Sequence, residues 1–220
     1  MRYGTRGYLT VGAGVAWLAA LALAGREGVG TTVGSIVSWK PAATKHLVTP
    51  DQLLECGGKS DRPVEPLSSM AHDGGRFRWP SVGVARPLVM IFIKRDCPCS
   101  VEFEPLFHRL EERYRDVADF VGVIDAGVDQ ARAYAVANRV PYRVLADPEG
   151  AIIGRFEAKH GGYVALLGPG ARIDTLWPGC SAEMMRSLGS RLAALGASPE
   201  RSLDLSGAPK VLTTGCPFRL

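Results

Sequence analysis

An apolar run that ends directly at two cysteines constrains the fold of this chain more than any other stretch. Residues 87–93 read PLVMIFI, a continuous apolar run that is typical of a β-strand buried on both faces. The sequence KRDCPCS follows. Apolar residues then recur at helical spacing, at Phe103, Leu106, Phe107, Leu110 and Tyr114. Cys97 and Cys99 are therefore expected where a buried strand passes into an amphipathic helix, with a kink at Pro105.

Strands and helices continue to alternate along the chain. We expect a strand at 120–125, a helix at 128–140, two strands joined at 168–171, and a final helix from Ser181 to Gly196. Before the apolar run, residues 49–57 predict a short helix, and the turn at 73–75 predicts a hairpin. This order predicts an α/β fold with a mixed central sheet flanked by helices.

The domain organisation follows from the composition along the 220 residues. We expect a signal peptide or transmembrane anchor at 1–25, a linker and N-terminal extension at 26–79, the main domain at 80–197 and a C-terminal tail at 198–220.

The N-terminus has the pattern of an export segment. Arg2 and Arg6 precede the uncharged residues 8–24, and Ala22 to Ala24 form a small-x-small pattern. A cleaved signal peptide and a retained anchor are both open, and a buried helix of the fold is the third reading. Either export reading places the domain outside the cytoplasm, in the periplasm or cell envelope, with the membrane as a partner of the N-terminal segment. The five cysteines would then face an oxidising compartment.

Several functional classes find no support in the sequence. The net charge of +4 comes from scattered Lys and Arg residues, which does not indicate a nucleic-acid surface. No phosphate-binding glycine loop, Ser-His-Asp arrangement or metalloprotease helix stands out. We expect no cofactor.

Three stretches carry a resemblance to known proteins. The stretch LVMIFIKRDCPCSVEFEPLFHRLEERY resembles the active-site strand, cysteine motif and first helix of the thioredoxin-like superfamily. The stretch VGVIDAGVDQARAYAVANRVPYRVLADPEGAIIGRF is similar to the middle of redoxins of the alkyl hydroperoxide reductase and thiol-specific antioxidant (peroxiredoxin-like) type. The stretch LLGPGARIDTLWPGCSAEMMRSL looks like the late strand pair and closing helix of the same proteins. The resemblance therefore runs from Pro80 to Gly196. It implies an antioxidant or disulfide-reducing activity with Cys97 as the nucleophile.

The chain departs from the patterns of these families at three points. Ser100 falls on the resolving position of thioredoxins, and Cys99 lies one residue before it. Met90 and Lys94 stand where related peroxidases have Pro and Thr. Gly162 stands at the position of the family's cis-proline. These departures weigh more against a peroxidase than against dithiol exchange.

The position of Cys97 predicts a reactive thiolate. A helix N-terminus presents unpaired N–H groups and the positive end of its dipole, and Lys94 and Arg95 add positive charge. Pro98 suits a first helical turn because it has no N–H to satisfy. We therefore expect a lowered pKa for Cys97.

Two cysteines are candidates to resolve an oxidised Cys97. A Cys97–Cys99 disulfide would close a strained ring. Cys216, in TTGCPF, resembles the C-terminal Val-Cys-Pro resolving motif of two-cysteine peroxidases. Cys56 and Cys180 are expected to form a structural disulfide with each other or with Cys216.

The expected function is a redoxin-type thiol oxidoreductase whose partners are thiol or disulfide proteins or hydroperoxides. One alternative is a copper-delivering protein that binds Cu(I) through Cys97, Cys99 and His160; His108 is a weaker candidate ligand. The other alternative is a catalytically degenerate domain that only binds partners.

Overall fold

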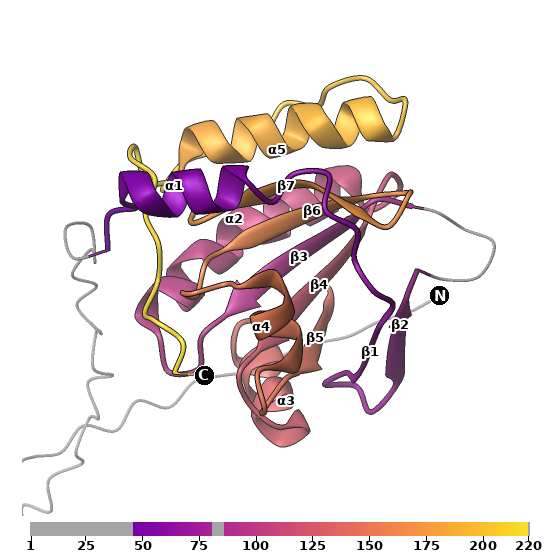
Figure 1. The fold of residues 1–220 in the computed structure, drawn as a ribbon, viewed down its shortest axis with the longest axis vertical. Helices are drawn as coiled ribbons and strands as arrows, with labels where there is room; N and C mark the ends of the chain where they lie inside the picture. Colours follow the sequence, from indigo (N-terminus) through magenta and orange to yellow (C-terminus); the bar gives the residue numbers. More distant parts are fainter. Residues whose placement is uncertain (1–45, 81–85, 220) are drawn as a thin grey trace, which may run out of the picture. The chain divides into compact units, whose positions relative to one another are not determined.

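A five-stranded mixed sheet with the order β5-β4-β3-β6-β7 organises the described part of the chain (Figure 1). The computed structural model describes residues 46–80 and 86–219. The strands of the sheet are β3 (Leu88–Ile93), β4 (Asp119–Ile124), β5 (Arg143–Ala146), β6 (Val164–Gly168) and β7 (Arg172–Trp177). The helices are α1 (Pro50–Gly57), α2 (Pro98–Tyr114), α3 (Val128–Ala137), α4 (Ala151–Phe156) and α5 (Ala182–Leu195). The expected α/β fold is confirmed.

The central strand β3 places the two cysteines. It is parallel to β4 and antiparallel to β6, and all six of its residues are buried, as the apolar run predicted. In the register with β4, Ile93 lies opposite Ile124. The segments that follow these two strands therefore leave the sheet at the same edge, which brings Lys94 close to Asp125.

Alternate residues of β3 face two different layers. Val89, Ile91 and Ile93 belong to the core that α2 and α5 complete. Leu88, Met90 and Phe92 belong to the core on the other face, with Cys56 of α1, the apolar residues of α4 and the hairpin of β1 (Leu67–Met70) and β2 (Arg76–Trp79). This period of two is the expected geometry of a strand buried on both faces.

The segment before the main sheet also contains regular structure. Thr49 caps α1 in a capping box with Gln52, and β1 (Leu67–Met70) pairs with β2 (Arg76–Trp79) in the predicted antiparallel hairpin. The domain boundaries at 25, 79 and 197 remain predictions. The expected signal peptide or anchor lies outside the described residues. Among the residues that are described, no helix is both long and apolar enough to span a membrane.

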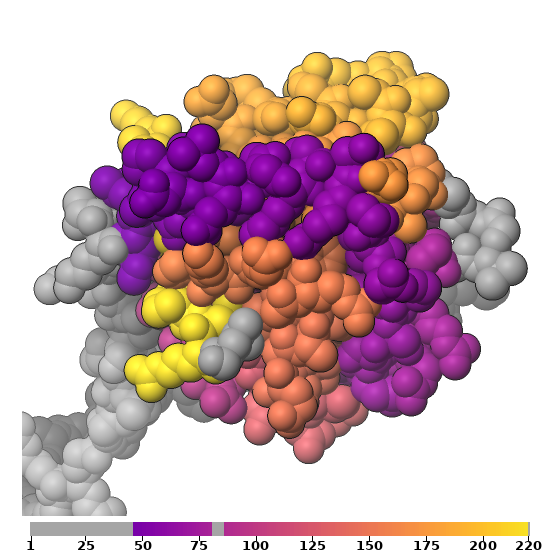
Figure 2. Space-filling model, viewed as in Figure 1, coloured from indigo at the N-terminus to yellow at the C-terminus, as the bar shows by residue number. Residues whose placement is uncertain are grey.

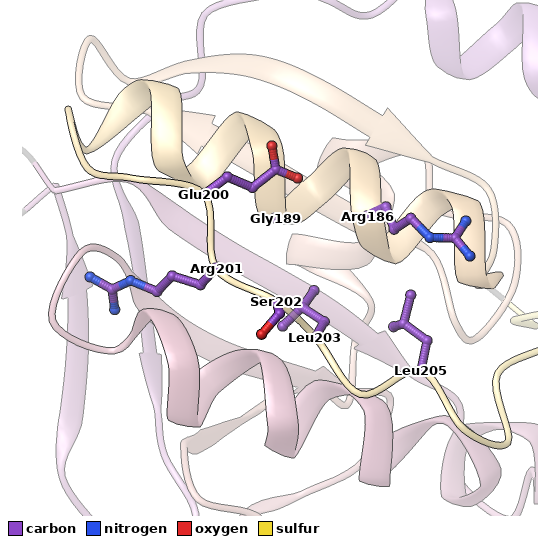
Figure 3. A pocket seen from close by; sticks show the side chains of 7 residues that line it. All are labelled: Arg186, Gly189, Glu200, Arg201, Ser202, Leu203 and Leu205. Carbon is purple, nitrogen blue, oxygen red and sulfur yellow. The ribbon is translucent and has the colours of Figure 1, made fainter.

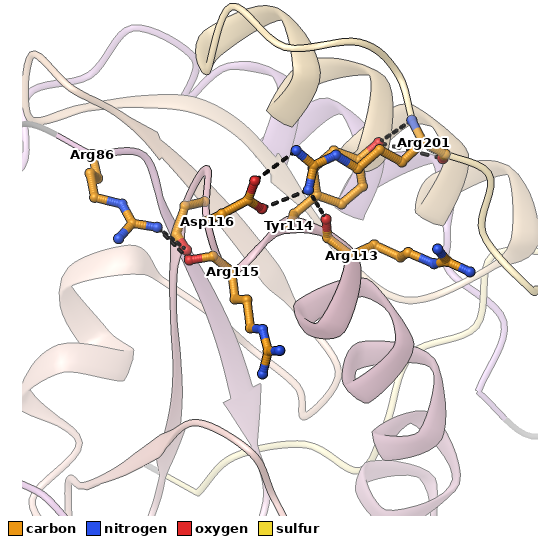
Figure 4. Close-up of polar contacts among 7 residues, drawn as sticks. Arg86, Arg113, Tyr114, Arg115, Asp116 and Arg201 are labelled. Carbon is orange, nitrogen blue, oxygen red and sulfur yellow. Dashed lines mark hydrogen bonds and ion pairs between the residues drawn. The ribbon is translucent and has the colours of Figure 1, made fainter.

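The chain after α5 returns across α2. Figure 4 shows Arg201 of this segment bound to the C-terminal end of α2: its guanidinium contacts both carboxylate oxygens of Asp116, at 2.6 and 2.8 Å, and the carbonyl oxygen of Arg113. The backbone N–H of Arg201 donates to the Tyr114 hydroxyl at 2.9 Å. These contacts fix the start of the C-terminal segment at the C-terminal end of α2.

Between this segment and α5 lies a cavity of about 250 Å³ (Figure 3). It is lined by Arg186, Gly189, Glu200, Arg201, Ser202, Leu203 and Leu205. None of these residues carries a thiol or imidazole.

Candidate thiol site

The turn between β3 and α2 holds Cys97 at the start of the helix. Cys97 is the N-cap of α2, with an extended backbone, and its side chain is 2% exposed. The carboxylate of Asp125 accepts hydrogen bonds from Lys94 Nζ and from the backbone N–H of Arg95, both at 2.6 Å. The Ser100 hydroxyl accepts from the backbone N–H of Lys94 at 3.1 Å. The turn is therefore fixed from the end of β4 and from the first turn of α2.

The C-terminal segment lies directly on the cysteine. The backbone N–H of Cys216 donates to Cys97 Sγ at 3.1 Å. Gly215 packs so closely that an added Cβ would lie 3.3 Å from Cys97 Sγ and 2.6 Å from the carbonyl oxygen of Gly161. Figure 2 shows C-terminal residues, in yellow, on the surface beside the orange residues of the α4 region. This segment accounts for the burial of Cys97.

Hydrogen bonds to the sulfur lower the pKa of Cys97 to about 4. The largest cause is the hydrogen bond with the Cys99 thiol. Burial opposes it, and the thiol and backbone N–H of Cys216 lower the pKa further. The direction agrees with the sequence prediction, but the cause does not. Lys94, which was expected to contribute positive charge, is engaged in an ion pair with Asp125.

Cys99 is the partner that keeps its proton. It is 1% exposed in the first turn of α2. The hydrogen bond to Cys97, burial and the negative charge on Cys97 all raise the pKa of Cys99. Cys99 is thus the thiol donor and Cys97 the thiolate acceptor of this pair.

Cys216 is the most accessible of the three thiols. It is half-buried, and burial together with its contacts to Cys97 raises its pKa to about 11. Cys216 borders a polar cavity of about 770 Å³. The cavity is lined by Lys94, Arg95, Asp96, Asp125, Pro148, Glu149, Cys216, Pro217 and Arg219. The site is therefore open to solvent on the side of Cys216 and closed directly over Cys97.

The expected structural disulfide is absent. All five cysteines are free thiols in this structure. Cys56 belongs to the core on one face of the sheet and Cys180 to the core on the other, so the sheet separates them. Burial raises the pKa of Cys56 to about 11 and that of Cys180 to about 12, so neither thiol is activated.

The two histidines considered as copper ligands have other partners. His160 Nδ1 lies 3.2 Å from Gln52 Nε2, and its ring stacks on Tyr163. His108 Nε2 lies 3.5 Å from Glu104. Within residues 46–80 and 86–219, no three His, Cys, Asp or Glu side chains are grouped closely enough to hold a metal ion.

A buried carboxylate on α2 was not anticipated from the sequence. Glu104 is 2% exposed, and it accepts hydrogen bonds from the hydroxyl groups of Tyr134, at 2.8 Å, and Tyr142, at 2.6 Å. The Tyr134 hydroxyl also lies 3.1 Å from the carbonyl oxygen of Ser100. This network connects α3 to the first turn of the helix that carries the cysteines.

The sequence also gave no direct sign of the role of Gly161. Its N–H and carbonyl groups both bond to the C-terminal segment, and its Cα faces Lys94 and Ser100. The paired glycines before β6 were a usable signal, because glycine permits close backbone approach.

Comparison with known proteins supports the fold assignment. No protein-family model and no curated protein matches the sequence. Among solved structures, a putative protein disulfide isomerase from Bacteroides thetaiotaomicron is similar with a TM-score of 0.57 and 16% identity, covering 63% of this chain and 91% of that one. The peroxidoxin BcpB from Mycobacterium tuberculosis matches with a TM-score of 0.51 and 21% identity, covering 66% and 99%.

A secreted disulfide oxidoreductase from Mycobacterium tuberculosis gives a TM-score of 0.50 and 21% identity, covering 59% of this chain and 96% of that one. These likenesses, with the order of strands and helices, define a thioredoxin-like fold. Its distant structural neighbours include both peroxiredoxins and disulfide oxidoreductases.

Proposed function

We propose that this protein is a thiol-based oxidoreductase in which Cys97 is the nucleophile and Cys216 the resolving cysteine. One observation carries the proposal: three cysteines meet at the start of α2, and their hydrogen bonds favour the thiolate of Cys97 while keeping Cys99 and Cys216 protonated. A thiolate is the reactive form of cysteine toward disulfides and hydroperoxides.

With a disulfide substrate, the Cys97 thiolate attacks one sulfur, forms a mixed disulfide and releases the other sulfur as a thiolate. Cys216, after losing its proton, attacks Cys97 and releases the remaining substrate thiolate. The substrate gains two electrons, and Cys97 and Cys216 lose them. With a hydroperoxide, Cys97 takes the terminal oxygen to become a sulfenic acid, the alcohol leaves, and condensation with Cys216 releases water.

Cys216 is preferred to Cys99 as the resolving residue for two reasons. A Cys97–Cys99 disulfide would span one intervening residue inside a helical turn, which strains the bond. The Cys99 thiol already stabilises the Cys97 thiolate, and its pKa is raised further than that of Cys216. External thiols would reduce the Cys97–Cys216 disulfide and complete the cycle.

Disulfide mapping by mass spectrometry after limiting oxidant tests this assignment. We expect a Cys97–Cys216 disulfide in the wild type, and a sulfenic acid or mixed disulfide at Cys97 in Cys216→Ser. Cys56→Ala is the matched control, because this thiol lies in the core on the opposite face from Cys97. A first oxidation at any cysteine other than Cys97 would refute the proposal.

An extracytoplasmic location is part of the proposal. It rests on the apolar residues 8–24 behind Arg2 and Arg6. Cell fractionation of the full chain, beside a version in which charged residues interrupt this stretch, distinguishes an exported or anchored protein from one that stays in the cytoplasm.

A further inference from the structure

The C-terminal segment binds beside Cys97 through its backbone. The N–H of Gly161 donates to the carbonyl oxygen of Cys216 at 3.0 Å, and the N–H of Gly215 donates to the carbonyl oxygen of Gly161 at 2.6 Å. The N–H of Phe218 donates to the carbonyl oxygen of Lys159 at 2.9 Å. His160 and Pro217 form an antiparallel bridge. The residues around Gly161 therefore hold an extended peptide in the manner of a neighbouring β-strand.

This arrangement leaves no room for another molecule at Cys97. Cys97 is 2% exposed, and Gly215 lies against its sulfur. A substrate sulfur must reach Cys97 through the position that Gly215 fills. Residues 213–217 must therefore move away from Cys97 before its sulfur can react with a substrate. Their departure exposes three groups side by side: the Cys97 thiolate and the N–H and carbonyl groups of Gly161.

We propose that the backbone of Gly161, beside Cys97, is a binding site for an extended polypeptide segment that carries a disulfide-bonded cysteine, and that residues 213–217 occupy this site when no substrate is bound. In the productive complex the substrate backbone takes the two hydrogen bonds of Gly161, and its cysteine takes the place of Cys216. The inference rests on the proposed function and narrows its substrate class to protein disulfides.

The surroundings of this binding site fit a polypeptide. The adjoining 770 Å³ cavity has charged groups of both signs, including Arg95, Asp96 and Glu149. Such a lining suits polar flanking residues of a peptide rather than the apolar chain of a lipid hydroperoxide.

Residues 213–217 also provide the thiol for the second step of the reaction, that of Cys216. The Cys97 thiolate attacks the substrate disulfide and releases one substrate cysteine as a thiolate. When residues 213–217 return to Gly161, Cys216 attacks the mixed disulfide at Cys97 and the second substrate thiolate leaves. Two electrons pass from the pair Cys97 and Cys216 to the substrate, so return of the segment both resolves the intermediate and displaces the product.

The test uses the full chain with Gly215→Ala and Cys216→Ser. The alanine Cβ would collide with the carbonyl oxygen of Gly161, which releases the segment, and the serine removes the resolving thiol. The matched control is Val211→Ala with Cys216→Ser, because Val211 is exposed and its change leaves the pairing at Gly161 in place. Release of a coloured thiol from activated disulfides reports the attack by Cys97.

Three probes carry the same coloured leaving group. The first is the peptide Thr-Thr-Gly-Cys-Pro-Phe activated at its cysteine. The second is the same peptide with an N-methyl group on the glycine amide, which cannot donate to the carbonyl oxygen of Gly161. The third is activated glutathione. With the released segment we expect the first peptide to saturate and to react about tenfold faster than either comparator, the effect of one lost hydrogen bond near a charged group.

The outcomes separate the two proposals. Equal rates for the three probes, or equal rates for the two protein variants, would overturn the receptor inference while leaving Cys97 an active nucleophile. No reaction with any probe would refute the proposed function itself. If the Gly215 variant fails to fold, the three probes are compared on Cys216→Ser alone. Each probe then competes with residues 213–217 for the site, so all three reaction rates fall. The same ranking of the three probes is expected.

Discussion

The backbone N–H of Cys216 donates to Cys97 Sγ at 3.1 Å, across 119 positions of the chain. The contact links the charge of the Cys97 sulfur to the binding of residues 213–217 beside it. A donor that stabilises the thiolate is itself held more firmly by the thiolate than by a neutral thiol. Oxidation or alkylation of Cys97 removes that charge, so it weakens the attachment of residues 213–217.

The pKa of Cys97 should depend on the Cys99 thiol. The pKa lies near 4 in the wild type, so the thiolate persists at neutral pH and is lost only as the pH falls through about 4. Cys99→Ala removes the principal hydrogen-bond donor, and we expect the midpoint to rise by about one to two units. Thiolate absorbance in the ultraviolet, followed against pH in variants with Cys56 and Cys180 replaced, measures it.

Cys180→Ala alone is the control for that titration. This thiol is fully buried and its pKa is raised, so its loss should leave the midpoint unchanged. A wild-type midpoint near the ordinary thiol value of about 8.5 would contradict the assignment of the thiolate to Cys97.

Asp125 should stabilise the turn that carries Cys97. Its carboxylate binds Lys94 Nζ and the backbone N–H of Arg95, and both side chains of the ion pair are less than one-fifth exposed. Asp125→Asn removes the charge and turns one acceptor into a donor, so we expect a loss of about 1–3 kcal/mol in the free energy of unfolding. Denaturant unfolding measures the change.

Asp61→Asn is the control variant for the stability loss expected in Asp125→Asn. Asp61 also binds a basic side chain, Arg172, but it is 83% exposed, and surface ion pairs contribute little. Equal losses for the two variants would show that the bonds to Lys94 and Arg95 do not hold the turn.

Substitution of two glycines should have opposite effects on stability. An added Cβ at Gly161 would lie 2.8 Å from Lys94 Cβ and 3.0 Å from Ser100 Oγ, whereas at Gly154, in α4, it would meet nothing within 4 Å. Gly161→Ala should therefore lower the melting temperature and expose Cys97 to alkylation. Gly154→Ala should raise stability by about 0.5–1 kcal/mol, because alanine reduces the entropy of the unfolded chain. Thermal unfolding and alkylation rates of both variants test this contrast.

The fold was predictable because its signals are local. The apolar run that forms β3, the period of α2 and the cap at Ser181 each depend on residues a few positions apart, and the structure confirms them. The position of Cys97 at the helix start follows from the same local pattern. Gly196, expected to end the last helix, is its C-cap.

The contacts of the site were less predictable because they join distant segments. Gly215 meets Gly161 across 54 positions through backbone atoms, which leave no side-chain signature in the sequence. The pairing of Lys94 with Asp125 depends on the register of β3 and β4, which the sequence does not specify. The prediction of a disulfide between Cys56 and Cys180 was wrong for a similar reason. The order of residues along the chain does not tell which face of the sheet each cysteine occupies.

The buried carboxylate of Glu104 should make its tyrosine partners important for stability. The hydroxyl of Tyr142 donates to Glu104 at 2.6 Å inside the core. Tyr142→Phe removes this donor and leaves a buried carboxyl oxygen without its partner, which should cost about 1–3 kcal/mol in the free energy of unfolding. Tyr163→Phe is the matched control, because the Tyr163 hydroxyl is also buried but donates to no carboxylate among the described residues, so its removal should cost much less. Denaturant unfolding of both variants measures the difference, and a Tyr142→Phe protein as stable as the wild type would mean that this hydrogen bond does not stabilise the fold.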